Sequence, residues 1–335
     1  MRRVRLWRMG FLGSVATILL TVASLAPHLT DSAELVRLRN TLLLDVDEST
    51  RFDWTPATMP ADFAVEHAPP APRFKERVVA LHLDALPSDW ERALAIGRHL
   101  LAHRQTHVGD PIQSDLEDTY RIIRSGAKGY CGDYVDVFAA LAIAAGLPVR
   151  SWAFSFDGFG GRGHVFNEVW DAQAGKWRMI DVFHNYYITG ADGAPVSALE
   201  FRTAMLTQPQ SLQFHSIEPS ALPVFKYEAR ARQFYERGLG QWYLWWGNDV
   251  FTYDDAMLVR IFGPVSRGLE QLGGITQQVY PHIRVLMDDG NREQVLAMQR
   301  LKTRMLVALG VALFATMTAL LCLAGWLRAR RKGAA

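Results

Sequence analysis

The sequence of 335 residues predicts an α+β domain, with helices packed on an antiparallel sheet, flanked by two transmembrane helices. Three observations lead to this prediction. Serine-led capping patterns mark helix starts in the middle of the chain, a strand–turn–strand pattern follows, and a long apolar run stands near each end. These signals divide the chain into a basic tail at 1–8, an anchor at 9–28, a linker at 29–85, a core at 86–195, a helical, aromatic-rich extension at 196–304, a second transmembrane helix at 305–327 and a basic tail at 328–335.

The first apolar run is expected to anchor the chain in a membrane. Four arginines precede it, and it extends from about Met9 to Ala26. A secretory signal peptide has the same pattern. Pro27 would directly follow a cut after Ala26 and disfavours cleavage there, so we expect an uncleaved anchor.

The second apolar run, from Met305 to Leu327, carries no charge and is long enough to cross a bilayer. Three arginines and a lysine follow it. Basic flanks stay on the cytoplasmic side. We therefore predict an integral protein of the cytoplasmic membrane, with both termini cytoplasmic and the main domain periplasmic or extracellular.

The charge of the part between the anchors argues against nucleic-acid binding. Residues 1–30 and 305–335 contain eight basic and no acidic residues, so the middle holds 28 basic and 34 acidic residues. The surplus of +2 over the whole chain therefore reflects membrane topology. The membrane itself, through two anchors, is the first predicted partner.

Several segments are expected to form regular elements. Glu34 to Val46 is expected to be a short helix or strand, Glu66 to Pro72 an extended linker and Val78 to Leu83 a strand. Capping boxes begin three helices, at Ser88–Glu91, Ser114–Glu117 and Ser197–Glu200. Further patterns indicate a strand at 149–156, a helix at 225–237 and a polar helix at 291–304 that leads into the second span.

Cys131 stands where a glycine-containing loop becomes a helix. Apolar residues recur at helical spacing from Tyr134, and Gly146 ends the pattern. In the first helical turn the thiol is expected to carry more thiolate, which is its nucleophilic form. The alternative is a small buried apolar residue, but flanking glycines favour a tight turn and close approach of a ligand. Cys322, inside the second span, is expected to have no functional role.

A β-hairpin is predicted from residues 163–182. If its connection has an even number of residues, Trp170 pairs with Trp177 and His164 becomes a diagonal neighbour of Asp181 on one face. A thiol, a histidine that takes its proton and a carboxylate that orients the imidazole make a nucleophilic triad. The glycine-rich loop 157–163 before His164 is expected to be a mobile lip or a plain connector.

Three motifs of the chain resemble the transglutaminase-like superfamily of papain-fold thiol enzymes, in a bacterial-type, membrane-anchored form. They are Gly129 to Cys131 with its helix ending in Gly-Leu-Pro-Val-Arg, the strand from His164 to Trp170, and Trp177 followed by Asp181. The resemblance covers about residues 89–189. It implies a papain-like/transglutaminase-like core in which Cys131 is the nucleophile, His164 the general base and acid, and Asp181 the orienting group. Phe166 and Val182 stand where the family often has Trp and Pro.

The predicted reaction is acyl transfer at an amide of a protein or peptide substrate, through a thioester and without a cofactor. Water as acceptor makes the enzyme a peptidase or amidase, an amine makes it a transamidase, and we favour hydrolysis slightly. The alternative is a catalytically silent scaffold that binds a peptide or polysaccharide partner in an envelope assembly. A role in transport has no support, because the spans carry no intramembrane charge.

The remaining candidate residues rest on weaker signals. Gln113 is a candidate second oxyanion donor beside the Cys131 N–H, and Glu168 a candidate support for His164; both also fit surface positions. Substrate contacts are assigned to Gly129, Tyr130, Trp242, Trp245 and Trp246, although the tryptophans also fit core packing or a membrane interface.

Three further histidines and an asparagine are candidate site or metal-binding residues. His184 and Asn185, just past Asp181, are alternative members of the site. His103 and His107 are expected at the surface, because no partner stands at metal-ligand spacing. We predict no metal.

Overall fold

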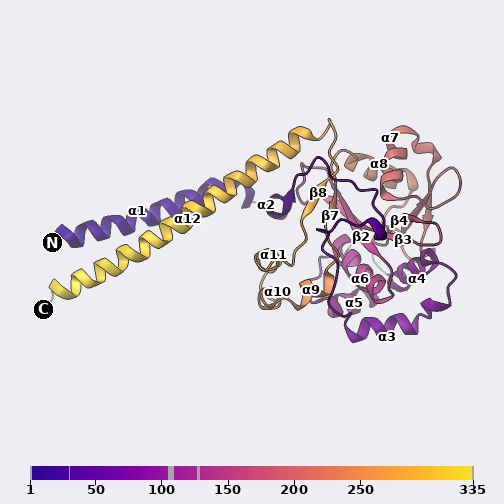
Figure 1. Cartoon of the computed structure of the whole chain (residues 1–335), viewed down its shortest axis with the longest axis horizontal. Helices are drawn as coiled ribbons and strands as arrows, with labels where there is room; N and C mark the ends of the chain where they lie inside the picture. Colours follow the sequence, from indigo (N-terminus) through magenta and orange to yellow (C-terminus); the bar gives the residue numbers. More distant parts are fainter. Residues whose placement is uncertain (1, 30, 105–108, 127–128, 334–335) are drawn as a thin grey trace. The chain divides into compact units, whose positions relative to one another are not determined.

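The computed structural model describes residues 2–29, 31–104, 109–126 and 129–333. Its contacts divide the chain into two compact units. Residues 1–42 and 293–335 form the helical unit, and residues 43–292 form the α+β unit. Figure 1 shows the elements of both units.

The helical unit contains the two apolar segments. They form α1 (Arg2–Leu25) and α12 (Arg292–Gly333), with α2 at Ser32–Leu43. Two helices, Val4–Leu29 and Arg292–Arg331, are long and apolar enough to cross a membrane. The predicted polar helix before the second span is thus continuous with it, within α12. Such helices are compatible with membrane anchoring.

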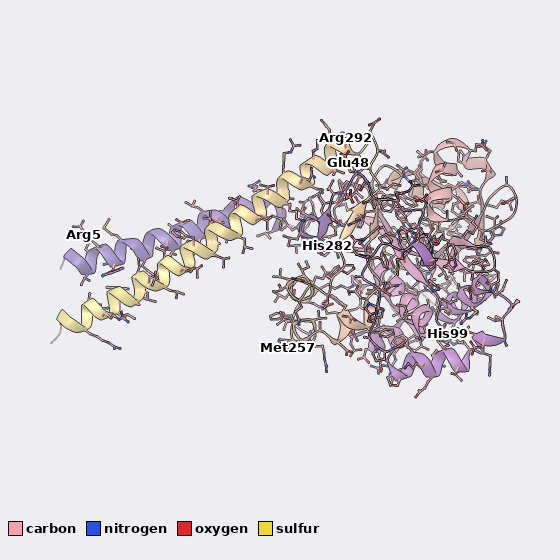
Figure 2. The ribbon with its side chains drawn as sticks, viewed as in Figure 1. Arg5, Glu48, His99, Met257, His282 and Arg292 are labelled. Atoms are coloured by element: carbon pink, nitrogen blue, oxygen red, sulfur yellow. The ribbon has the colours of Figure 1, made fainter. Side chains whose placement is uncertain are left out.

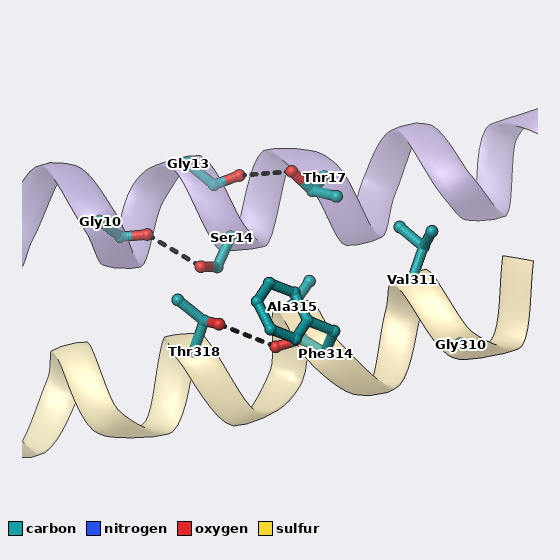
Figure 3. A pocket seen from close by; sticks show the side chains of 9 residues that line it. All are labelled: Gly10, Gly13, Ser14, Thr17, Gly310, Val311, Phe314, Ala315 and Thr318. Atoms are coloured by element: carbon teal, nitrogen blue, oxygen red, sulfur yellow. Dashed lines mark hydrogen bonds between the residues drawn. The ribbon is translucent and has the colours of Figure 1, made fainter.

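Helices α1 and α12 run antiparallel and pack through small residues. A Cβ atom at Gly10 would lie 2.7 Å from the Cys322 sulfur, and one at Gly325 would lie 2.6 Å from the Trp7 ring. At the other end of the pair, Arg304 donates to the backbone oxygen of Ser24. Figure 3 shows the shallow pocket between the helices, lined by Gly10, Gly13, Ser14, Thr17, Gly310, Val311, Phe314, Ala315 and Thr318. Small residues permit this close approach of two helices.

The α+β unit is built on one sheet. In the described residues it has eight strands in the order β1-β8-β7-β2-β3-β4-β5-β6, and only the β1–β8 pair is parallel. The prediction of an α+β fold is therefore confirmed. The strands are β1 (Leu44–Asp45), β2 (Val149–Ser155), β3 (Gly163–Asp171), β4 (Lys176–Asp181), β5 (Tyr186–Thr189), β6 (Gln213–Ser216), β7 (Trp242–Trp245) and β8 (Ile283–Val285).

Helices cover both faces of this sheet (Figure 1). Side chains on alternate sides of β3 enter different cores: Val169 packs with α4 and α6, whereas Phe166 packs in an aromatic core with α7 and α8. The helices are α3 (Pro72–Ala80), α4 (Asp89–Leu101), α5 (Leu116–Arg124), α6 (Cys131–Ala144), α7 (Ala198–Thr207), α8 (Glu228–Gly238), α9 (Val250–Asp255), α10 (Met257–Phe262) and α11 (Arg267–Thr276), with 3₁₀ turns at 26–29, 56–58, 83–85 and 209–211.

The helix starts follow the capping signals with one shift. Ser88 accepts from the backbone N–H of Glu91, and Ser197 forms the full capping box with Glu200. The second helix begins one residue later than predicted, because Asp115 and not Ser114 caps it. Aspartate is an equally good cap.

Two predictions for the segment before the core are corrected. Residues 78–83 are not a strand, since Val78 and its neighbours belong to α3, which begins with Pro72 at a position that suits proline. Glu66 is more than linker, because its carboxylate accepts from the backbone N–H groups of Phe251 and Thr252 at the start of α9.

Candidate functional site

Cys131 is the first residue of α6, as predicted, and is partly exposed. The loop before it is fixed by Asp133, whose carboxylate accepts from the backbone N–H of Tyr130 at 2.8 Å and of Ile112 at 3.1 Å. Gly129 has φ +133°, and a Cβ there would lie 2.7 Å from the Tyr134 ring. Glycine is therefore required two residues before the thiol.

The hairpin β3–β4 has the predicted register. Trp170 pairs with Trp177, and His164 Nε2 lies 2.6 Å from Asp181 Oδ2. Both side chains are buried. A Cβ at Gly163 would lie 2.0 Å from the Phe154 backbone oxygen, so glycine is needed for the close β2–β3 approach that positions His164.

His164 interacts with both of the other predicted triad members. Burial lowers its pKa, but the Asp181 carboxylate, followed by a hydrogen bond to the Cys131 side chain, outweighs burial and raises the pKa to about 9. Although burial opposes the charge of Asp181, its two neighbouring imidazoles hold the pKa of that carboxyl well below its usual range. The structure therefore favours an imidazolium–carboxylate pair beside the sulfur.

Two further side chains bind the same carboxylate oxygen. His184 Nδ1 lies 3.0 Å from Asp181 Oδ2, and the Tyr235 hydroxyl donates to it at 2.5 Å. The other oxygen, Oδ1, accepts from the His184 backbone N–H at 3.1 Å. We call His164, Asp181, His184 and Tyr235 the Asp181 network. Within it, Asp181 is held by hydrogen bonds to both oxygens.

The two histidines of the network titrate in opposite directions. Their rings stack with centroids 3.9 Å apart. Burial and the neighbouring positive charge of His164 lower the pKa of His184 to about 4. At neutral pH one ring is therefore charged and the other neutral.

Sequence reasoning found this network only in part. His184 was an alternative candidate, whereas Asn185 binds Glu218 through its side chain and takes no part. Tyr235 was missed, because it lies on α8, 54 residues after Asp181, and only tertiary packing brings it to the sheet. The aromatic spacing of α8 gives no signal for this contact.

The same residues also have the composition of a metal site. His164, Asp181 and His184 offer ligand atoms within 4.8 Å of one another, and among the described residues no other such group is found. Our prediction of no metal rested on the neighbours of His103 and His107 in the sequence, whereas these three residues come together only in the fold. The hydrogen bonds from His164, His184 and Tyr235 already occupy the Asp181 oxygen that both rings face. His103 is exposed, and His107 lies outside the described residues.

Two weaker candidates have other partners. The Gln113 side chain donates to the backbone oxygen of Gly263 at 2.6 Å and to Glu270 at 2.9 Å. Glu168 is fully buried and accepts from Arg150 at 2.7 Å, from Trp152 at 2.9 Å and from the backbone N–H of Ala198 at 2.6 Å. Gln113 therefore connects its loop to α11. Glu168 is part of a buried hydrogen-bond network and not a solvent-exposed charge on a strand.

The aromatic candidates divide by exposure. Trp242 and Trp246 are buried in the aromatic core, which corrects their assignment to substrate contact, because no ring face is open. Trp245 is half-buried and contacts Tyr280. Tyr130 is 45 % exposed and stacks on Phe183 beside His164, so it stays a candidate.

The glycine-rich loop before His164 is extensively hydrogen-bonded. Asp157 accepts from the backbone N–H of Gly160, and Gln241 accepts from those of Gly158 and Phe159. Phe159 itself is buried. The loop is therefore tied to the start of β7.

Comparison with known proteins identifies one region. Residues 84–182 match the model of the transglutaminase-like superfamily, and this match includes Cys131, His164 and Asp181 but not His184 or Tyr235. Neither a curated protein nor a solved structure matches the chain. The chain therefore contains a transglutaminase-like domain at residues 84–182, as the resemblance of its sequence motifs predicted.

Proposed function

We propose that the α+β unit is a thiol enzyme that acts on amide bonds through Cys131, His164 and Asp181. One observation carries the proposal: His164 is hydrogen-bonded to Asp181 at 2.6 Å, and the Cys131 side chain at the start of α6 is close enough to contribute to the raised pKa of His164. This is the order of groups that nucleophilic catalysis needs.

The reaction begins with attack of the Cys131 sulfur, as thiolate, on the amide carbonyl carbon. The tetrahedral intermediate collapses when His164 gives its proton to the amine nitrogen, the C–N bond breaks and a thioester remains. Water or an amine then attacks the thioester while His164 takes a proton from it, and the sulfur leaves as thiolate. The backbone N–H groups at the start of α6 are natural donors to the oxyanion.

The charges of the network support these roles. With a pKa of about 9, His164 is protonated at neutral pH and has a proton ready for the leaving amine. Asp181 orients the imidazole and stays ionised. This chemistry requires no cofactor.

We propose a peptidase or amidase first and a transamidase second, with a protein or peptide as substrate, because water is always available as acceptor. We also propose that α1 and α12 hold the protein in the cytoplasmic membrane, with both ends cytoplasmic and the α+β unit outside. Arginines at both ends and the antiparallel packing of the two helices support this topology.

The test is the rate of iodoacetamide alkylation of Cys131 as a function of pH. It uses the full-length protein with Cys322→Ala, so that Cys131 is the single thiol. We expect a fast rate that persists at pH 6.5, where an ordinary thiol of pKa about 8.5 is only about 1 % thiolate. His164→Ala should lower the rate at pH 6.5 by roughly 100-fold. An equal alkylation rate in the Cys322→Ala parent and in its folded His164→Ala variant would refute the enzyme proposal. The catalytically silent scaffold would then be the better proposal.

A metal role has one specific observation in its favour, the grouping of His164, Asp181 and His184. The two proposals predict different results. A thiol enzyme keeps its alkylation profile after dialysis against a chelator, whereas a metal site contains about one metal ion per chain and loses it in His184→Ala.

A further inference from the structure

Exposed apolar side chains of the α+β unit are concentrated in a short stretch. Helices α10 and α11 pack against each other at Leu258 and Gly273, and we call residues 257–276 the α10–α11 hairpin. Among the described residues, ten large apolar side chains of this unit are exposed, and half lie in the hairpin. The ten are Val79, Tyr130, Leu206, Leu222, Tyr227, Met257, Ile261, Val265, Leu269 and Leu272.

These side chains lie at spacings that place them on one face of each helix. Met257 and Ile261 are four residues apart on α10, Leu269 and Leu272 are three apart on α11, and Val265 lies in the turn between the helices, so each helix presents a single apolar face. Figure 2 shows Met257 at the periphery of the unit. Exposed apolar side chains gathered in one part of a surface mark a protein or membrane contact.

We infer that the α10–α11 hairpin lies in the surface layer of the lipid bilayer. The inference rests on the proposed anchoring by α1 and α12. Those helices join the α+β unit at both of its ends, so the unit is confined to a membrane surface. A lipid surface is therefore the apolar environment always within its reach.

The position of the α10–α11 hairpin in the α+β unit agrees with contact between the hairpin and lipid. It leads directly into β8, whose partner β1 begins one residue after the end of α2. In Figure 1, α10 and α11 lie on the β7–β8 side of the unit. The half-buried Trp245 and Tyr280 are in contact there, and Arg260 is exposed on α10. Tryptophan, tyrosine and arginine are favoured at the boundary between lipid and water.

The inner side of the hairpin holds the loop that precedes the thiol. Arg267 donates to the backbone oxygen of Ile112 at 2.6 Å and pairs with Asp133 at 3.3 Å. Gln113 donates to Glu270 at 2.9 Å. A hairpin seated in lipid therefore fixes the Cys131 loop relative to the membrane, and the site would meet amides that are presented at the bilayer surface.

The experiment measures the depth of spin labels on the full-length protein in vesicles of phosphatidylcholine and phosphatidylglycerol. In a Cys131→Ala, Cys322→Ala background, single labels are placed by Val265→Cys, Val79→Cys and Phe314→Cys. The native side chains are similarly exposed, at 69 %, 72 % and 73 %. Collision with oxygen, which concentrates in lipid, is compared with collision with a water-soluble nickel chelate.

We expect the ratio of oxygen to nickel collisions at Val265 to be several times that at Val79 and to approach that at Phe314, which lies inside a span. A water-like ratio at Val265 with a lipid-like ratio at Phe314 overturns the inference and leaves the anchoring intact. A water-like ratio at Phe314 overturns both. Protection of Val265 from both reagents means that a protein, such as a second copy of this chain, covers the hairpin instead of lipid, and this also overturns the inference.

Discussion

Two carboxylates lie buried on the same face of strands β3 and β4, and they have different surroundings. Glu168 accepts from Arg150, Trp152 and a backbone N–H, all of which keep their protons at any ordinary pH. Asp181 accepts from two imidazoles and a phenol. Imidazoles gain and lose protons near neutrality. Burial therefore does not distinguish a candidate site from a core. The two carboxylates differ in whether their hydrogen-bond partners change protonation state near neutral pH.

The largest expected effect separates the two carboxylates directly. Asp181→Asn should lower the alkylation rate of Cys131 at pH 6.5 by roughly 100-fold, as is expected for His164→Ala. The reason is that His164 loses the carboxylate that orients its ring and stabilises its protonated form. Glu168→Gln should instead lower the free energy of unfolding by about 3–5 kcal/mol, since it leaves Arg150 buried without a counter-charge.

The two variants are compared by alkylation kinetics and by denaturant unfolding of the full-length protein in one detergent. Folded Glu168→Gln should keep the alkylation rate of the parent. If Glu168→Gln slows alkylation as much as Asp181→Asn does, the two networks act as one, and the distinction between site and core is lost.

The second effect concerns stability against pH. The pKa of His184 is lowered to about 4 in the folded protein, so its contribution to stability is present above pH 6.5 and lost as the pH falls from 6.5 towards 4. The pKa of His164 is raised to about 9, so its contribution is present below pH 6.5 and lost as the pH rises through 9. The midpoint of thermal unfolding should therefore fall on both sides of neutrality.

A matched histidine tests the acid side of that profile. His99 on α4, labelled in Figure 2, lies 2.8 Å from the Tyr120 hydroxyl, and burial lowers its pKa to about 4 as well. His184→Phe and His99→Phe should each reduce the loss of stability below pH 6.5. Only His184→Phe should change the alkylation profile of Cys131, and equal profiles would contradict a role of His184 in the site.

The smallest expected effect is that of Tyr235→Phe. Loss of one hydroxyl donor makes ionised Asp181 less stable, so the acid limit of Cys131 alkylation should move to higher pH and the rate at pH 6.5 should fall several-fold. Tyr253→Phe is the control, because it also removes a hydrogen bond from a tyrosine hydroxyl to a partly buried carboxylate, that of Glu270, at 2.8 Å. An unchanged profile in both variants would reduce Tyr235 to a packing residue.

The sequence predicted the contacts that depend on local rules. The pairing of Trp170 with Trp177 follows from alternation and loop length, and this register alone brings His164 to Asp181. The start of α6 at Cys131 follows from glycines and helical spacing.

Other features depend on tertiary packing and were mispredicted or missed. Residues 78–83 have strand-like composition, but Pro72 begins a helix whose Phe74 and Val78 reach the core. Trp242 belongs to an aromatic cluster in the sequence that suggested substrate contact, but in the structure it packs against Phe154 and Trp152. Tyr235 has no local signature, since its partner is fixed only when α8 packs on the sheet.

The position of Tyr235 has a consequence for how the protein is made. Synthesis proceeds from the N-terminus, so Cys131, His164, Asp181 and His184 emerge from the ribosome before α8 does. Until α8 folds onto the nascent sheet, Asp181 lacks one of the three donors to its Oδ2 oxygen. The Asp181 network is thus completed by a later part of the chain, when most of the α+β unit has been translated.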